Sequence, residues 1–179
     1  MKFISVSTLA LIVLSTLVAA APIPKPTIYL IRHGEKPSDG GTGLSSDGKK
    51  RAQCLRKVFG PSSKYNIGYI MAQKYKADGS RARPYLTVKP LAKDLGLTVD
   101  TKCDRNDPKC VKKAVGKYKG SGNILISWQH DALTDIAETL GDKTPPKYPD
   151  DVYGQIWSDL APYADVKTIA KENCPGLGH

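Results

Sequence analysis

Short apolar runs alternate along the chain with stretches in which apolar residues recur every three or four positions. Three runs predict buried β-strands, because they are short, rich in β-branched and aromatic residues, and bounded by turn-forming residues. They cover residues 27–32, 67–72 and 123–128. A fourth strand is expected near residues 153–157, and no pattern is evident in the tail that follows.

The intervening stretches predict helices. Ser45 or Ser46 can cap a helix whose apolar positions are Ala52, Leu55 and Val58 or Phe59. Residues 84–95 also have helical spacing, but Pro90 lacks an amide hydrogen, so two pieces or a kink are expected there.

Two further helices have clearer ends. Asp107 is a capping residue and Pro108 suits the first helical position; the apolar positions that follow are Val111, Ala114, Val115 and Tyr118. The last predicted helix closes at Gly141, after apolar positions Leu133, Ile136, Ala137 and Leu140. Strands that alternate with helices predict an α/β layered fold.

The first residues have the pattern of a secretory leader. Lys2 precedes an apolar core over residues 9–18, and Val18-Ala19-Ala20 is a small-residue cleavage site. A membrane anchor is the competing interpretation, but prolines from position 22 onward end the apolar run before the roughly 20 residues that spanning requires. We therefore expect a signal peptide at residues 1–20, one domain over residues 21–179, and a secreted, extracellular protein.

The chain has four cysteines, at positions 54, 103, 110 and 174. An even number in an exported chain favours disulfides, and four cysteines allow three pairings. We favour Cys103 with Cys110, because a turn-rich stretch separates them; Cys54 would then pair with Cys174. Spacing typical of a zinc site is absent from the sequence.

The net charge of the chain indicates which class of partner it attracts. Lys and Arg number 27 against 17 Asp and Glu, a net charge of +10, which predicts attraction to anions. Basic residues cluster at 49–51, at 56–57 and at Lys109, Lys112, Lys113, Lys117 and Lys119. A basic polyanion-binding protein is therefore one hypothesis, although no nucleic-acid motif and no aromatic interleaving support a specific nucleic-acid partner.

Candidate chemistry lies at the ends of two predicted strands. His33 follows the first strand and His130 follows the strand at 123–128. Ligands of open α/β sheets bind beyond the carboxyl ends of the strands, so the two imidazoles are expected to converge. A single histidine at such a position is often only a hydrogen-bonded residue at the end of a strand. Here, however, Arg32 and Gly34 flank His33. The planar guanidinium of an arginine matches phosphate oxygens, and a glycine without a Cβ atom lets a ligand approach closely.

The sequence resembles the histidine phosphatase superfamily, also called phosphoglycerate-mutase-like. The resemblance rests on four anchors: LIRHGE at 30–35, LSSDGKKRA at 44–52, Arg83 followed four residues later by Thr87, and His130 after an apolar strand. It implies a three-layer α/β sandwich with a mostly parallel central sheet flanked by helices, in a small secreted member without a cap domain.

The resemblance also implies roles for individual residues. His33 would be the nucleophile of a phosphomonoesterase that forms a phosphohistidine, and Arg32, Arg83 and His130 would bind the phosphate. Arg83 is preferred to Arg81 because of the offset to Thr87. The proton donor would be Asp131 or, second, Glu35.

No cofactor and no metal are expected. The expected partner is a small phosphorylated substrate or a phosphoprotein, with no specific nucleic acid, no stable membrane anchor and a monomeric state. The alternative to an active enzyme is a catalytically inactive secreted relative or a basic polyanion-binding protein.

Overall fold

Within residues 24–178, six strands form one sheet whose spatial order differs from their order in the sequence. The structure is a computed structural model, and it describes residues 24–178. The sheet order is β3-β2-β4-β1-β5-β6. The first four strands in this order pair in parallel, and β5 pairs antiparallel with both β1 and β6, which confirms the mostly parallel sheet. The strands are β1 (Ile28–Arg32), β2 (Ile67–Ala72), β3 (Val99–Asp100), β4 (Asn123–Trp128), β5 (Gln155–Asp159) and β6 (Val166–Lys171).

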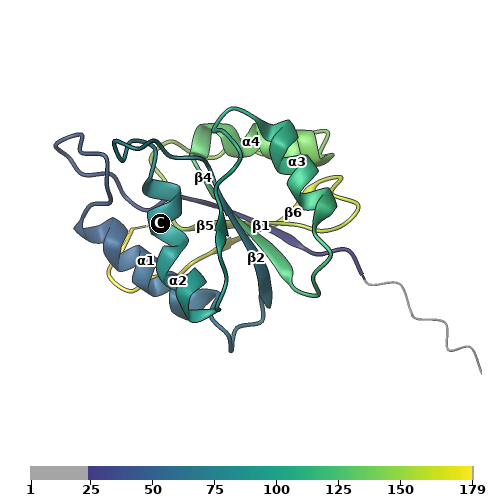
Figure 1. Cartoon of the computed structure of the whole chain (residues 1–179), viewed down its shortest axis with the longest axis horizontal. Helices are drawn as coiled ribbons and strands as arrows, with labels where there is room; N and C mark the ends of the chain where they lie inside the picture. Colours follow the sequence, from purple (N-terminus) through teal and green to yellow (C-terminus); the bar gives the residue numbers. More distant parts are fainter. Residues whose placement is uncertain (1–23, 179) are drawn as a thin grey trace, which may run out of the picture.

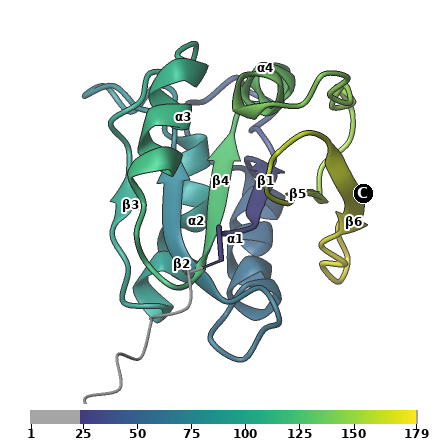
Figure 2. The same cartoon turned by 90° about the vertical axis from the view of Figure 1, so that its right-hand side faces the viewer.

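Helices cover both faces of this sheet, as Figures 1 and 2 show. Helices α1 (Ser46–Val58) and α2 (Arg83–Asp94) pack together on one face, and α3 (Pro108–Lys117) and α4 (His130–Leu140) pack together on the other. The chain therefore has the predicted three-layer α/β architecture. Within the described residues no inserted domain separates these elements.

The two hydrophobic cores explain why the parallel strands have continuous apolar runs. Successive side chains of a strand point to opposite faces, so Leu30 and Ile126 contact the α3–α4 layer, whereas Ile31 and Leu125 contact the α1–α2 layer. All four side chains are fully buried. A strand covered on both faces gains from apolar residues at every position.

The helix ends follow the predicted chemistry. The Ser45 hydroxyl accepts a hydrogen bond from the Gly48 amide at the start of α1, and Asp107 accepts one from the Cys110 amide at the start of α3. Gly141 ends α4 with a φ of 152°, a conformation that only glycine adopts easily.

Four elements differ in detail from what the sequence predicts. Helix α2 is one helix that includes Pro90, so the expected division into two pieces was wrong. The expected strand at 153–157 lies two residues later, as β5. The tail, which has no evident pattern, contains β6, and the two-residue β3 was not expected at all.

Both expected disulfides are present. Cys103–Cys110 joins the segment after β3 to the first turn of α3, and Cys54–Cys174 joins α1 to the segment after β6. Such bonds fit an exported protein. The predicted leader at residues 1–20 lies outside the described residues. No helix within residues 24–178 is long and apolar enough to cross a membrane.

One buried carboxylate has no polar partner among the described residues. Asp159, at the end of β5, is fully buried, and neither of its carboxylate oxygens makes a hydrogen bond. Burial, together with the nearby charges of Asp142 and Asp165, raises the pKa of Asp159 to about 7. The stability of the fold is therefore expected to depend on pH through this residue.

Candidate active site

The two histidines lie at the same end of neighbouring strands. β1 pairs with β4 in parallel, with Arg32 opposite Trp128, and the His33 amide donates a hydrogen bond to the Trp128 carbonyl at 3.0 Å. His130 begins α4 two residues after β4 ends. The sheet thus brings together two imidazoles that are separated by almost a hundred positions in sequence.

His33 is buried and held in one tautomer. Its side-chain Nδ1 lies 2.7 Å from the Gly34 carbonyl oxygen, and because a carbonyl can only accept, Nδ1 carries the proton. The other ring nitrogen, Nε2, then has a free lone pair. Burial, with the positive charges of Arg32, Arg83 and Lys36, lowers the pKa of His33 to about 3. The imidazole is therefore neutral at physiological pH.

Thr87 connects the loop after β1 to helix α2. Its fully buried hydroxyl accepts a hydrogen bond from the Gly34 amide and donates one to the Arg83 carbonyl, both at 2.8 Å. The four-residue offset between Arg83 and Thr87 is one helical turn, which allows the second bond. Thr87 therefore fixes the peptide next to His33 relative to the first residue of α2.

Arg83 reaches from the start of α2 to the glycine-rich loop. Its Nε donates to the Gly43 carbonyl at 3.1 Å and its Nη2 donates to the Gly41 carbonyl at 2.8 Å. Because its charge acts on His33, the guanidinium lies within electrostatic range of the imidazole. The carbonyls of the loop thus orient a cation beside His33.

Arg32 is buried and is held by the loop between α4 and β5. Its Nη1 donates to three backbone carbonyls, of Pro149, Asp150 and Val152, at 3.3, 2.8 and 2.6 Å. The Tyr153 ring centroid lies 3.9 Å from the guanidinium carbon, in the range of a cation–π contact. The Arg32 Nε atom is buried and has no partner among the described residues.

His130 contacts the same loop. Its Nε2 lies 3.1 Å from Asp150 Oδ1, while its Nδ1 is buried without a partner among the described residues. Burial, followed by the charge of Arg32, lowers the pKa of His130. A neutral ring then donates its Nε2 proton to the carboxylate. His33, Arg32, Arg83 and His130 thus lie near the carboxyl ends of the parallel strands.

The two expected proton donors have different surroundings. Glu35 is held by the buried Arg51, whose Nη2 lies 2.6 Å from Glu35 Oε1, and Arg51 also pairs with the buried Glu172. Asp131 is exposed at the start of α4 and pairs with Arg105 at 3.0 Å. Glu35 thus belongs to a buried ion cluster, whereas Asp131 stays accessible beside His130.

Sequence reasoning missed the contribution of the loop at 149–153. Asp150 contacts His130, and Tyr153 contacts Arg32. This proline-rich loop has no periodicity, so no pattern in the sequence indicates that it folds back over the strand ends. Arg51 was missed too, although the anchor at 44–52 contains it.

Among residues 24–178 there is no cluster of three or more His, Cys, Asp or Glu residues that could hold a metal ion.

Comparison with known proteins supports the fold. No family model matches the sequence, and no curated protein matches it. Among solved structures, that of the protein histidine phosphatase SixA complexed with tungstate is similar, with a TM-score of 0.56 and 13% sequence identity. The match covers 82% of this chain and 97% of that chain. The architecture implied by the resemblance to histidine phosphatases is thereby confirmed.

Proposed function

We propose that the protein is a secreted phosphomonoesterase that acts through a phosphohistidine on His33. The observation that carries this proposal is the hydrogen bond from His33 Nδ1 to the Gly34 carbonyl. It leaves the Nε2 lone pair as the reactive site of an imidazole whose pKa is lowered to about 3. A neutral imidazole with a fixed tautomer is a competent nucleophile toward phosphorus.

Arg32, Arg83 and His130 would bind the phosphate. Both guanidinium groups act electrostatically on His33, and Arg32 acts on His130, so these side chains share one region. Cations fixed by backbone carbonyls need little reorganisation when the charge on the equatorial oxygens increases in the transition state. The carbonyls of the loops at 41–43 and 149–152 supply this fixation.

The reaction has two steps. His33 Nε2 forms a bond to phosphorus while the bond to the leaving oxygen breaks, and a carboxylic acid gives that oxygen its proton. The resulting carboxylate then takes a proton from water, whose oxygen attacks phosphorus and releases His33 and inorganic phosphate.

Asp131 is our choice for the proton donor. Glu35 forms an ion pair with the buried Arg51, which also pairs with Glu172, so its carboxylate is part of a structural cluster. Asp131 is exposed at the start of α4, next to His130. A donor matters most when the leaving group is a poor one. Asp131→Asn should therefore slow hydrolysis of an alkyl phosphate by about a hundredfold or more and slow that of an aryl phosphate much less. Equal losses on both substrates would contradict the assignment.

Two substrate classes fit this site: small phosphomonoesters and a phosphorylated side chain of a protein. The similar solved structure is that of a protein histidine phosphatase, which supports the second class. The two disulfides fit the proposed secretion. Both substrate classes share the transferred phosphoryl group, so the same nucleophile would serve either one.

The deciding experiment measures hydrolysis of a generic aryl phosphate in the presence of EDTA. Wild-type protein should be active and His33→Ala inactive, and an acid-labile phosphoenzyme should be trapped only on the wild type. Arg83→Ala should lose most activity, whereas the matched control Arg81→Ala, at an exposed neighbouring arginine, should lose little. Activity that survives His33→Ala would refute the mechanism. A wild type that binds tungstate but turns over no substrate would identify an inactive relative.

A further inference from the structure

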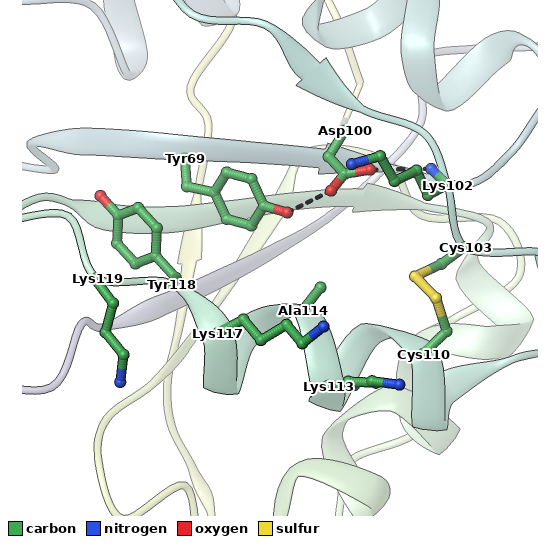
Figure 3. Close-up of a pocket in the computed structure, with 10 residues that line it drawn as sticks. All are labelled: Tyr69, Asp100, Lys102, Cys103, Cys110, Lys113, Ala114, Lys117, Tyr118 and Lys119. Atoms are coloured by element: carbon green, nitrogen blue, oxygen red, sulfur yellow. Dashed lines mark hydrogen bonds between the residues drawn. A yellow bond between two sulfur atoms is a disulfide. The ribbon is translucent and has the colours of Figure 1, made fainter.

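A cavity of about 430 Å³ lies between the β2–β3 side of the sheet and helix α3. Figure 3 shows its lining. None of the lining residues belongs to the group around His33, and β4 separates β2 from β1 in the sheet. The proposed phosphatase chemistry therefore leaves this cavity unexplained.

The cavity has an excess of positive charge. Four lysines line it, and none of them forms an ion pair within residues 24–178: Lys102, Lys113, Lys117 and Lys119. The single lining carboxylate, Asp100, is already occupied, because it accepts hydrogen bonds from the Tyr69 hydroxyl at 2.6 Å and from the Lys102 amide at 3.0 Å. Burial raises the pKa of Tyr69, so the hydroxyl remains a donor.

Two stacked tyrosines form one end of the cavity. The ring centroids of Tyr69 and Tyr118 are 5.2 Å apart, and the ring planes differ by 10°. Tyr118 can lie here because residues 68 and 120 are glycines, since a Cβ atom at either position would collide with its hydroxyl. The opposite end is closed by the Cys103–Cys110 disulfide (Figure 3).

The lysines face this cavity from two sides. Lys113 and Lys117 are one turn apart on α3, so they share a helix face, and Ala114 between them leaves space. Lys102 follows β3 on the opposite side, as Figure 3 shows. Because the disulfide fixes the start of α3 against the segment after β3, the two sides are held at a defined separation before any ligand arrives.

We propose that this cavity binds an aromatic phosphate of nucleotide size, with its ring against the Tyr69–Tyr118 pair and its phosphates among Lys102, Lys113 and Lys117. The volume lies within the roughly 300–1,000 Å³ of small-ligand sites. Stacking on aromatic side chains binds a base through its π-face, and unpaired ammonium groups attract a multiply charged anion. The inference is independent of the chemistry proposed for His33.

The test uses adenosine diphosphate as the probe, titrated into isotope-labelled His33→Ala protein that cannot form the phosphohistidine. The backbone NMR signals of Tyr69, Lys113 and Tyr118 should shift, and saturating tungstate should not prevent this. Adenosine alone and pyrophosphate alone should each bind at least about tenfold more weakly, since each lacks one of the two contacts. Shifts confined to the neighbourhood of Gly34, or pyrophosphate binding as tight as that of the diphosphate, would overturn the proposal.

Two sets of variants separate this site from general charge attraction. The double variant Lys113→Gln, Lys117→Gln should weaken binding at least about tenfold. The matched control Lys109→Gln, Lys143→Gln removes the same charge from exposed positions outside the cavity and should change Kd less than about threefold. Equal losses would refute a defined site. Gly120→Ala, which displaces the Tyr118 ring without a change of charge, should also weaken binding.

Discussion

Replacing the buried Asp159 by Asn should stabilise the protein at neutral pH and have little effect at acidic pH. The carboxyl group is fully buried without a hydrogen bond, and its pKa rises from 3.8 to about 7. Burial is the main cause, and the charges of Asp142 and Asp165 add to it. The folded protein thus binds this proton far more tightly than the unfolded chain does.

The sign and size of the effect follow from that difference. Between about pH 4 and pH 7 the unfolded carboxyl is ionised while the folded one is protonated, so stability falls as the pH rises through this window. The difference between 3.8 and about 7 corresponds to about 4 kcal/mol, at 1.36 kcal/mol for each pKa unit. Asn cannot ionise, and Asp159→Asn should therefore avoid most of this loss.

The assay is urea unfolding of wild type and variant at pH 4 and pH 7.5. Titrating groups that do not interact with Asp159, including the buried Glu172, contribute equally to both proteins. The difference between the two proteins therefore reports Asp159 together with its coupling to Asp142 and Asp165. The variant should be more stable by up to about 4 kcal/mol at pH 7.5, or about 8–16 °C in Tm, with near equality at pH 4. The control Asp135→Asn, at an exposed position of α4, should change neither value. The same stability difference at both pH values, or a less stable variant at pH 7.5, would refute the reasoning.

Three further predictions concern the disulfide of the tail and the site. The double variant Cys54→Ser, Cys174→Ser opens a loop of 120 residues, and it should lower the free energy of unfolding in urea by about 5 kcal/mol. This is roughly twice the loss expected on removal of the Cys103–Cys110 disulfide, which closes a short loop. Equal losses would contradict this prediction. Thr87→Val leaves the Gly34 amide without its buried partner, so it should lower the free energy of unfolding by about 1–3 kcal/mol. It should also lower kcat/KM, and a fully active variant would argue against a positioning role for Thr87. Burial lowers the pKa of His33 to about 3, so the ¹⁵N NMR signals of its ring should remain those of a neutral imidazole at pH 4. Titration of these signals near the ordinary histidine pKa of about 6.5 would disprove the buried environment.

The layers of the fold were predictable wherever burial sets a strong pattern. β1, β2 and β4 are covered on both faces, so apolar residues predominate on both sides of each strand. β6 is an edge strand with Ile169 half exposed, and its sequence therefore lacks a clear alternation of buried and exposed residues. β3 has only two residues, too few for any period.

Helix α2 was misjudged because local and tertiary effects conflict there. Pro90 removes one backbone donor, which favours a break. Val88 and Leu91, on either side of it, are fully buried against α1 and the sheet. The free energy of burying these side chains outweighs the lost hydrogen bond, so the helix continues.

The candidate site was predictable in part. His33 and His130 could be placed because each follows a strand, and ligands gather at strand ends. Asp150 and Tyr153 could not, because a loop position depends on the groups that hold it. Here the Arg32 guanidinium holds the loop through backbone carbonyls, and carbonyls are the same for every residue type.

The open edge of β6 has a consequence for the behaviour of concentrated solutions. In an antiparallel pairing of two copies centred on Ile169, Lys167 of one copy would face Lys171 of the other. The like charges would oppose this edge-to-edge association, a common protection of exposed strands. Salt weakens repulsion between exposed charges, so the tendency of the protein to self-associate should increase with ionic strength.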